Sequence, residues 1–169
     1  MNRRRGYTLI ELIIAVGLFA LIMLLASGAY LLMINLNRQA QNIATGINNL
    51  SFALEAMTRD IRTGTGYDCG GLSSCQVSSF SFKNENGTTV RYDLSGSALQ
   101  KTIGAATSIL TDPSVTISSL TFYVNGATKS DSQQPRVTII LSGTVVSGQG
   151  KTPQPFTVET GATMRGTDL

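Results

Sequence analysis

The stretch RRRGYTLIELIIAVGLFALIMLL, residues 3–25, decides the fold class of this chain. It joins three arginines to a long apolar run that holds a single carboxylate, Glu11, near its start. From Leu12 to Ile34 the chain has 23 residues without a charge. About 20 apolar residues are enough for a helix to cross the hydrocarbon core of a bilayer. The sequence therefore predicts a transmembrane helix close to the amino terminus.

The flanks of the apolar run favour a permanent anchor over a cleaved secretory signal peptide. A signal peptide has an apolar core of about 7 to 15 residues and a small-residue cleavage site. This run is longer, and the polar stretch after Asn35 offers no compact Ala-x-Ala site. Arg3, Arg4 and Arg5 precede the run, whereas only Arg38 follows it closely. That asymmetry predicts an amino terminus in the cytoplasm and a body outside it.

The composition of the 169 residues argues against several classes of function. The formal charge of +3 comes from 13 basic and 10 acidic side chains, so the balance is zero once the three leading arginines are set aside. Beyond these arginines, the sequence has no basic patch with interleaved aromatic residues, the pattern that indicates a nucleic-acid site. Histidine is absent, which removes the most common general base and transition-metal ligand. We expect a protein that is not an enzyme.

The string RRRGYTLIE, residues 3–11, followed by an apolar helix, resembles the amino-terminal cleavage and methylation motif of type IV prepilins and pseudopilins. The resemblance implies that a membrane aspartic peptidase, the prepilin peptidase, cuts after Gly6 on the cytoplasmic face. It also implies that the same enzyme methylates the new amino terminus at Tyr7. Phenylalanine is more frequent at this position of the family, so Tyr7 is a departure that keeps the aromatic ring. Gly28 stands where major pilins often have a helix-kinking proline, and glycine weakens a helix locally.

The same resemblance gives Glu11 a partner outside this chain. In the family, the equivalent carboxylate pairs with the amino terminus of a neighbouring subunit in the filament. Opposite charges attract strongly in a low-dielectric helix bundle, and an unpaired charge there is costly. We therefore expect Glu11 to set the register between subunits. The alternative is a carboxylate at the level of the lipid headgroups, without a partner.

Beyond the apolar run, the helical pattern continues with a polar face. Apolar residues recur at spacings of 4, 3, 4, 3 and 4, which is typical of one stripe on an amphipathic helix; they are Ile43, Ile47, Leu50, Leu54, Met57 and Ile61. Gly64 and Gly66 end the pattern. We interpret the charged string MTRDIR, residues 57–62, as a solvated helix face. Similar strings in minor pseudopilins of the J type favour a minor subunit.

The rest of the chain has the composition of strands. Alternating segments rich in threonine, valine and aromatic residues are separated by polar turns, one of which, NENG at residues 84–87, indicates a hairpin. The predicted strands are 76–83, 88–94, 97–103, 115–124, 136–146 and 156–165. An antiparallel sheet packed on the amphipathic helix follows, which is the α+β layout of the type IV pilin family.

Cys69 and Cys75 enclose five residues, CGGLSSC, outside the apolar segment. We favour a structural disulfide over free thiols, since such a pair is oxidised outside the cytoplasm. A zinc site needs further ligands, and no histidine supplies them. The aspartates Asp60, Asp68, Asp93, Asp112 and Asp131 lack the spacing of a calcium loop. No cofactor is expected, although some head domains of the type IV pilin family, which this chain resembles, bind calcium.

Four segments and one function summarise these expectations. The segments are a leader at 1–6, a transmembrane and assembly helix at 7–34, its amphipathic continuation at 35–63 and a β-rich head at 64–169. The expected function is a structural subunit, a minor pilin or pseudopilin, of a type IV pilus, a competence pilus or a type II secretion pseudopilus. Its partners would be the prepilin peptidase, other subunits, a membrane assembly platform and the lipid bilayer. It would reside in the cytoplasmic membrane and then in a periplasmic or extracellular filament. The alternative is a membrane-anchored binding module that never polymerises.

Overall fold

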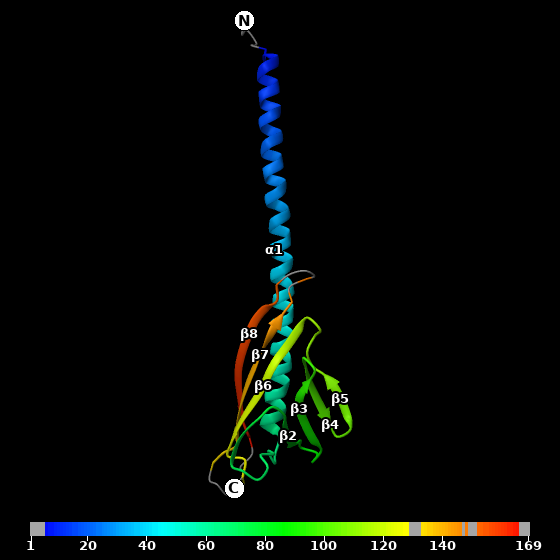
Figure 1. Cartoon of the computed structure of the whole chain (residues 1–169), viewed down its shortest axis with the longest axis vertical. Helices are drawn as coiled ribbons and strands as arrows, with labels where there is room; N and C mark the ends of the chain where they lie inside the picture. The colour runs from blue at the N-terminus through cyan, green and yellow to red at the C-terminus, as the bar shows by residue number, and fades with distance from the viewer. Residues whose placement is uncertain (1–5, 129–132, 147, 149–151, 166–169) are drawn as a thin grey trace. The chain divides into compact units, whose positions relative to one another are not determined.

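The computed structural model describes residues 6–128, 133–146, 148 and 152–165. Arg3, Arg4, Arg5 and Asp131 lie outside this described part. Two units divide the chain, Met1–Gln41 and Asn42–Leu169, and each is described by itself. Helix α1 (Leu9–Thr63) supplies the regular structure of the first unit and the start of the second (Figure 1).

In the first unit, the apolar side chains of α1 are uncovered. Leu9, Phe19 and Leu24 are 77%, 60% and 76% exposed, and a side chain built on Gly17 or Gly28 would have no atom within 4 Å. The helix continues through Gly28 without a break. Ser27 next to it donates its hydroxyl to the Met23 carbonyl at 2.7 Å, which satisfies the polar atom within the helix.

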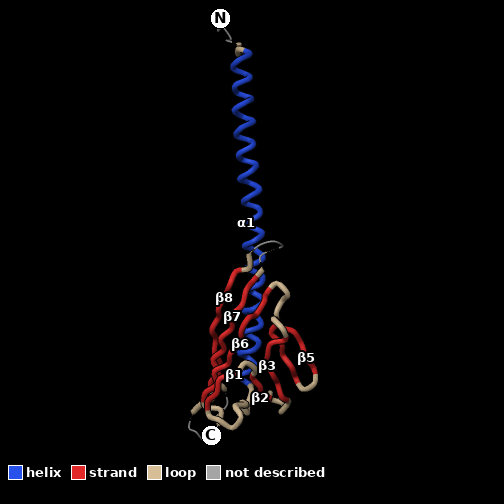
Figure 2. Tube along the Cα trace, in the orientation of Figure 1, coloured by secondary structure: helices blue, strands red, loops and turns tan. Residues whose placement is uncertain are grey.

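In the second unit, two antiparallel sheets of four strands pack with the amphipathic part of α1 (Figures 1 and 2). The first sheet has the order β1 (Ser74–Val77), β6 (Val115–Asn125), β7 (Arg136–Val145) and β8 (Gln154–Thr163). The second has the order β2 (Phe80–Lys83), β3 (Thr89–Ser95), β4 (Ala98–Ile103) and β5 (Ala106–Ile109). The predicted α+β class, with a long helix followed by antiparallel strands, is confirmed.

The core lies between the helix and the two sheets. Leu50, Leu54, Met57 and Ile61 from the predicted stripe are buried, as is Gly46 one turn earlier. Alternate residues of the strands face them, as the period of two requires. Aromatic rings from both sheets meet in one cluster, in which neighbouring ring centroids lie 5.3–6.3 Å apart; the members are Tyr67, Phe80, Phe82, Tyr92 and Phe122.

The predicted hairpin at residues 84–87 joins β2 to β3. The Asn84 side-chain oxygen accepts the backbone N–H groups of Asn86 and Thr88, at 3.0 and 2.9 Å. Gly87 has φ +74°, a left-handed conformation that glycine adopts without a steric cost. This local chemistry sets the register in which Phe80 faces Tyr92.

The carboxyl end of α1 is closed by tertiary contacts. The last carbonyl groups of a helix have no partner within it. Here the Tyr67 hydroxyl donates to the Ile61 carbonyl at 2.6 Å, and the Arg165 N–H donates to the Arg62 carbonyl at 2.9 Å. A Cβ atom on Gly64 would lie 2.7 Å from Cε2 of Phe82 and closer still to its Cδ2. Only glycine fits there without displacing the Phe82 ring.

Two predictions about the strands were wrong in detail. Residues 76–83 were expected to be one strand, but the chain bends at Ser78 and Ser79, so that β1 and β2 belong to different sheets. The inward-facing positions shift at the bend, from Cys75 and Val77 in β1 to Phe80 and Phe82 in β2. The pair Ser78–Ser79 interrupts the period of two in the sequence, and the prediction overlooked this break. Strand β5 was not predicted, because all four of its residues are exposed and uncharged and show no alternation.

Candidate functional site

The amino-terminal motif places three residues before the helix and caps the helix start. Gly6, Tyr7 and Thr8 precede the helix. The Thr8 hydroxyl accepts the Glu11 N–H at 3.3 Å, and the Thr8 carbonyl accepts the Leu12 N–H at 3.2 Å. Thr8 is thus the N-cap of α1, and Glu11 occupies the third helical position. Threonine at the cap with glutamate three residues later is a capping-box pattern, which is visible in the sequence but was not predicted from it.

The residues expected to be processed are accessible in the isolated chain. Tyr7 is 88% exposed, and nothing lies within 4 Å of a Cβ atom built on Gly6. Among the described residues, therefore, none packs against Gly6. The cap residue is Thr8, so a cut between Gly6 and Tyr7 would leave the cap intact.

Glu11 lies in the first turn of α1 and is exposed. The unsatisfied N–H groups of a helix start carry a partial positive charge, which favours a carboxylate at this position. The apolar side chains that follow are exposed as well, and α1 is long and apolar enough, by length and composition alone, to cross a membrane. Glu11 is thus an exposed carboxylate at the start of an uncovered apolar helix.

The two cysteines are joined in the structure, with their Cα atoms 5.6 Å apart. Asp68 stabilises the start of the loop between them, because its Oδ1 accepts the Gly70 N–H at 3.0 Å. Gly70 and Gly71 have φ values of +61° and +85°, and the Leu72 N–H donates to the Cys69 carbonyl at 3.2 Å. The loop is therefore a closed turn at the entrance to β1.

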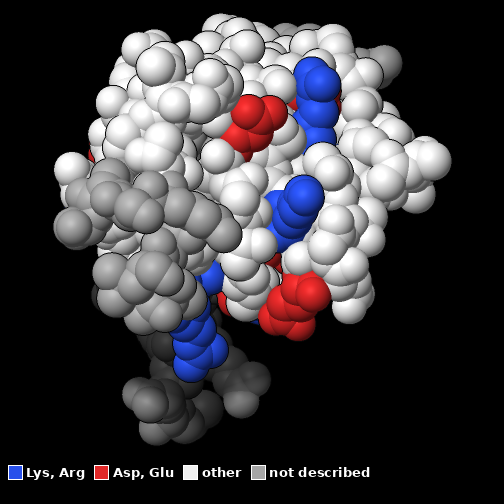
Figure 3. Space-filling view, turned by 90° about the horizontal axis from the view of Figure 1, so that it is seen from below, with Lys and Arg blue, Asp and Glu red and all other residues white. Residues whose placement is uncertain are grey.

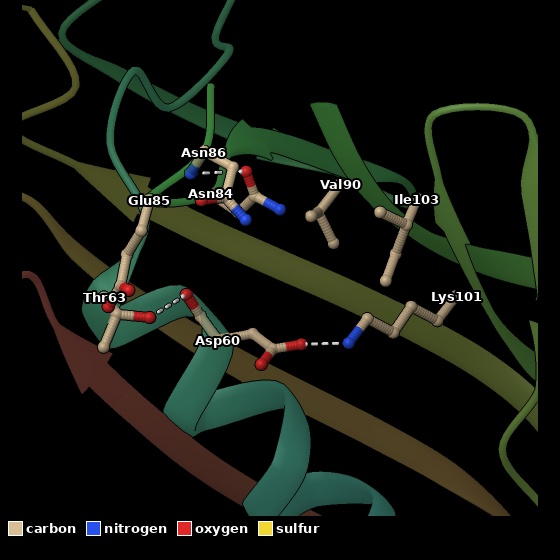
Figure 4. A pocket seen from close by; sticks show the side chains of 8 residues that line it. All are labelled: Asp60, Thr63, Asn84, Glu85, Asn86, Val90, Lys101 and Ile103. Atoms are coloured by element: carbon tan, nitrogen blue, oxygen red, sulfur yellow. Dashed lines mark hydrogen bonds and ion pairs between the residues drawn. The ribbon is translucent and has the colours of Figure 1, made fainter. Parts of the chain in front are cut away.

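A second polar cluster lies at the end of α1, in a hollow of about 320 Å³ (Figure 4). Tyr92 donates its hydroxyl to Oδ2 of Asp60 at 2.6 Å, and the Lys101 ammonium pairs with the same oxygen. Figure 4 shows Asp60 and Lys101 pointing toward one another beneath Val90 and Ile103. Burial, and then the hydrogen bond to Asp60 and its charge, raise the pKa of the Tyr92 phenol well above its ordinary value.

This cluster corrects our interpretation of the string MTRDIR. Arg59 does lie on an exposed face, where it pairs with Glu55 at 3.1 Å. Asp60, however, is only partly exposed, and its carboxylate binds two residues that lie 32 and 41 positions further along the chain. The cluster fastens the last turns of α1 to β3 and β4.

The acidic residues of the head do not gather. Within the described ranges, no three His, Cys, Asp or Glu side chains are close enough to hold a metal ion. Asp112 is engaged locally, since the hydroxyl and backbone N–H of Ser114 lower the pKa of its carboxyl. On the face of the head seen in Figure 3, acidic and basic side chains are interspersed among uncharged ones. The amino-terminal motif is therefore the strongest candidate for a functional site in the described part of the chain.

Comparison with known proteins gives one match. Residues 1–27 match the family described as the prokaryotic N-terminal methylation motif. The match supports the prepilin and pseudopilin family and covers Gly6, Tyr7 and Glu11 together with most of the uncharged run from Leu12 to Ile34. Among the curated proteins and the solved structures compared with the chain, none matches.

Proposed function

We propose that this chain, which carries the N-terminal methylation motif of the prepilin and pseudopilin family, is a structural subunit that the prepilin peptidase processes and that polymerises through α1. The observation that carries the proposal is the combination of a capped helix start, Glu11 in its first turn and an uncovered apolar helix behind it. The uncovered apolar helix is the part that a soluble protein would not expose to water, whereas lipid or the helices of a filament would cover it.

Cleavage after Gly6 would create the charge that Glu11 needs. The new amino terminus at Tyr7 is an ammonium group, one residue before the Thr8 cap. Within one subunit both charges sit at the same end of the helix. Between subunits that are offset along the filament axis, the ammonium of one chain can meet the carboxylate of the next. Because both groups are then away from water, each is costly without the other, and the pair selects one register.

The apolar residues of α1 supply the surroundings for this pair. The uncharged span from Leu12 to Ile34 is about 35 Å long at 1.5 Å per residue, against about 30 Å for a bilayer core. Lipid would cover it before assembly, and the helices of neighbouring subunits would cover it afterwards. Small residues on the helix, such as Gly17 and Gly28, allow close approach of another helix.

We further propose a minor pilin or pseudopilin located in the cytoplasmic membrane, with its amino terminus in the cytoplasm and its head outside. The head is small, and the MTRDIR string resembles that of J-type minor pseudopilins. The machine served would be a type IV pilus, a competence pilus or a type II secretion pseudopilus. Its partners would be the prepilin peptidase, other subunits, the assembly platform and the bilayer. Family membership supports a structural role and not an enzymatic one.

The decisive experiment is the intact mass and amino-terminal sequence of the full chain, recovered from membranes that contain an active prepilin peptidase. A chain that begins at methylated Tyr7 is expected. A chain that still begins at Met1 would contradict the proposal and favour the anchored binding module. For assembly, Glu11→Ala is expected to be cut normally but to be lost from filaments, whereas Glu55→Ala, on the exposed face of the same helix, should enter them.

A further inference from the structure

Strand β8 leaves the longest open edge in the described head. It is the last strand of its sheet and pairs with β7 without a shift of register, from Gln154 opposite Val145 to Thr163 opposite Arg136. In Figure 1 it forms the outer border of the sheet. The second sheet is different: one of its edges, at β2, is covered by the segment Thr65–Asp68 through three backbone hydrogen bonds, and the other, β5, has only four residues.

The hydrogen-bond pattern identifies the backbone groups on this edge. The Met164 N–H donates to the Pro135 carbonyl at 2.9 Å, and this pair continues the β7–β8 register. Hydrogen-bonded pairs alternate in an antiparallel ladder. The even-numbered residues of β8 therefore bond to β7, and Thr157, Glu159 and Gly161 turn their N–H and C=O groups away from the sheet. Arg165 follows the same alternation, because its N–H bonds to α1 at Arg62.

A groove runs beside the free edge. Val158, Glu159 and Thr160 of β8 line one side, Ser51, Leu54, Glu55 and Thr58 of α1 line the other, and the volume is about 340 Å³. Val158 and Phe156 face the core but remain half-buried, because no further strand covers them. One more strand along β8 would lie over this groove and complete the burial of both side chains.

The charge at this edge indicates what kind of strand fits. Glu159 is exposed at the middle of β8, and within the described part of the chain it has no hydrogen bond or ion pair. Glu55 across the groove is occupied by Arg59. A second copy of β8, paired antiparallel about the middle of the edge, would bring two Glu159 carboxylates opposite one another, which is destabilising. A partner strand with a cation at that position would be stabilised instead.

We propose that the free edge of β8 binds an extended segment of another protein, which adds to the sheet as a fifth strand. Its backbone bonds to Thr157, Glu159 and Gly161, its alternate apolar side chains cover Val158 and Phe156, and a lysine or arginine faces Glu159. This is strand addition, in which the backbone supplies affinity and the side chains supply selectivity. The inference stands on the head alone and does not depend on the proposed polymerisation.

The test uses the full chain in detergent micelles and a fluorescently labelled, end-blocked peptide in which threonine and valine alternate around one central lysine. Saturable binding is expected from fluorescence anisotropy. Amide hydrogen exchange, read residue by residue, should slow at Thr157, Glu159 and Gly161. Thr157→Pro removes an outward N–H, leaves the backbone bonds to β7 in place and should weaken binding roughly tenfold. Both this variant and Thr157→Val lose the side-chain hydroxyl that bonds to Ser142 of β7 at 3.0 Å. Thr157→Val keeps that N–H and should bind as the parent chain does.

The charge is tested by exchange of signs. Glu159→Lys should weaken the binding of the lysine peptide about threefold. It should strengthen the binding of a peptide with a central glutamate to a similar degree. A peptide interrupted by proline should not bind, which keeps the test valid if Thr157→Pro loses stability. The proposal is overturned if the lysine peptide does not bind saturably, if the proline-interrupted peptide binds equally well, or if protection falls on another edge. It is also overturned if β8 is already protected in a dimer without peptide.

Discussion

The Tyr92 hydroxyl donates a 2.6 Å hydrogen bond to the Asp60 carboxylate, although the two residues are 32 positions apart in the sequence. Lys101 pairs with the same oxygen and lies over the Tyr92 ring, 5.9 Å from its centroid. The three side chains come from α1, β3 and β4, so the cluster joins the helix to one sheet at a fixed position.

Removal of the Tyr92 hydroxyl should destabilise the head. Tyr92→Phe keeps the buried ring and removes one hydrogen bond to a charged acceptor, so a loss of about 1.5–3 kcal/mol in the free energy of unfolding is expected. Urea unfolding of the full chain in micelles, followed by near-ultraviolet circular dichroism, measures it. Tyr123→Phe is the matched control, because Tyr123 lies on the exposed face of β6. Equal stability of both variants would contradict the role of the cluster.

The same phenol should make the head sensitive to alkaline pH. Burial and Asp60 raise the pKa of Tyr92 in the folded protein, so the folded state favours the protonated phenol. This contribution to stability is fully present below the unfolded pKa of about 10 and is lost as the pH rises above it. The unfolding free energy of the parent chain should therefore be lower above that pH than below it. Tyr92→Phe should show a smaller fall, and an identical pH profile would argue against the raised pKa.

The Thr8 cap should hold the start of α1. Thr8→Val keeps the shape of the side chain but loses the oxygen that accepts the Glu11 N–H, which costs about 1 kcal/mol at a helix start. Amide exchange of Ile10 and Glu11 in micelles should quicken about fivefold for that loss. Thr8→Ser keeps the oxygen and should exchange like the parent chain. Protection that is unchanged in Thr8→Val would show that another group caps the helix.

Gly64 should not tolerate a side chain. Alanine there would place its Cβ against the Phe82 ring, which is itself fixed in the aromatic cluster. A loss of about 1–3 kcal/mol in the stability of the head is expected from such overpacking. Gly17→Ala provides the control, since no atom lies within 4 Å of its Cβ position. Comparable thermal unfolding of both variants would show that the end of α1 can move away from β2.

The bond between Cys69 and Cys75 should form when the head is exported. We expect no free thiol in the protein recovered from the cell envelope, as measured by alkylation and intact mass with and without reductant. Reduction should cost about 2 kcal/mol, since the closed loop is short. The double replacement Cys69→Ser with Cys75→Ser should behave like the reduced protein. Two alkylated cysteines without reductant would refute the pairing.

The features that the sequence determined by itself are local ones. The charge asymmetry around the apolar run, the motif from Gly6 to Glu11, the helical stripe that ends at Gly64 and the turn at Asn84 each depend on neighbours within a few residues. The periodicity of apolar residues and the residue types at turns can be read directly from the order of residues. The Thr8 cap belongs to the same class: we did not predict it, although the spacing from Thr8 to Glu11 would have been sufficient.

The tertiary structure alone decided how the strands divide into two sheets and which polar groups find distant partners. Residues 76–83 have the composition of a single strand, yet the chain bends at Ser78 and Ser79, because Val77 pairs with Phe122 of β6 while Phe80 pairs with Tyr92 of β3. Asp60 looks like one more solvated charge until Tyr92 and Lys101 are brought beside it. Strand pairing and buried ion pairs join residues that are far apart in the chain. Their free energies depend on the packing of the whole head, and no local pattern of residues encodes them.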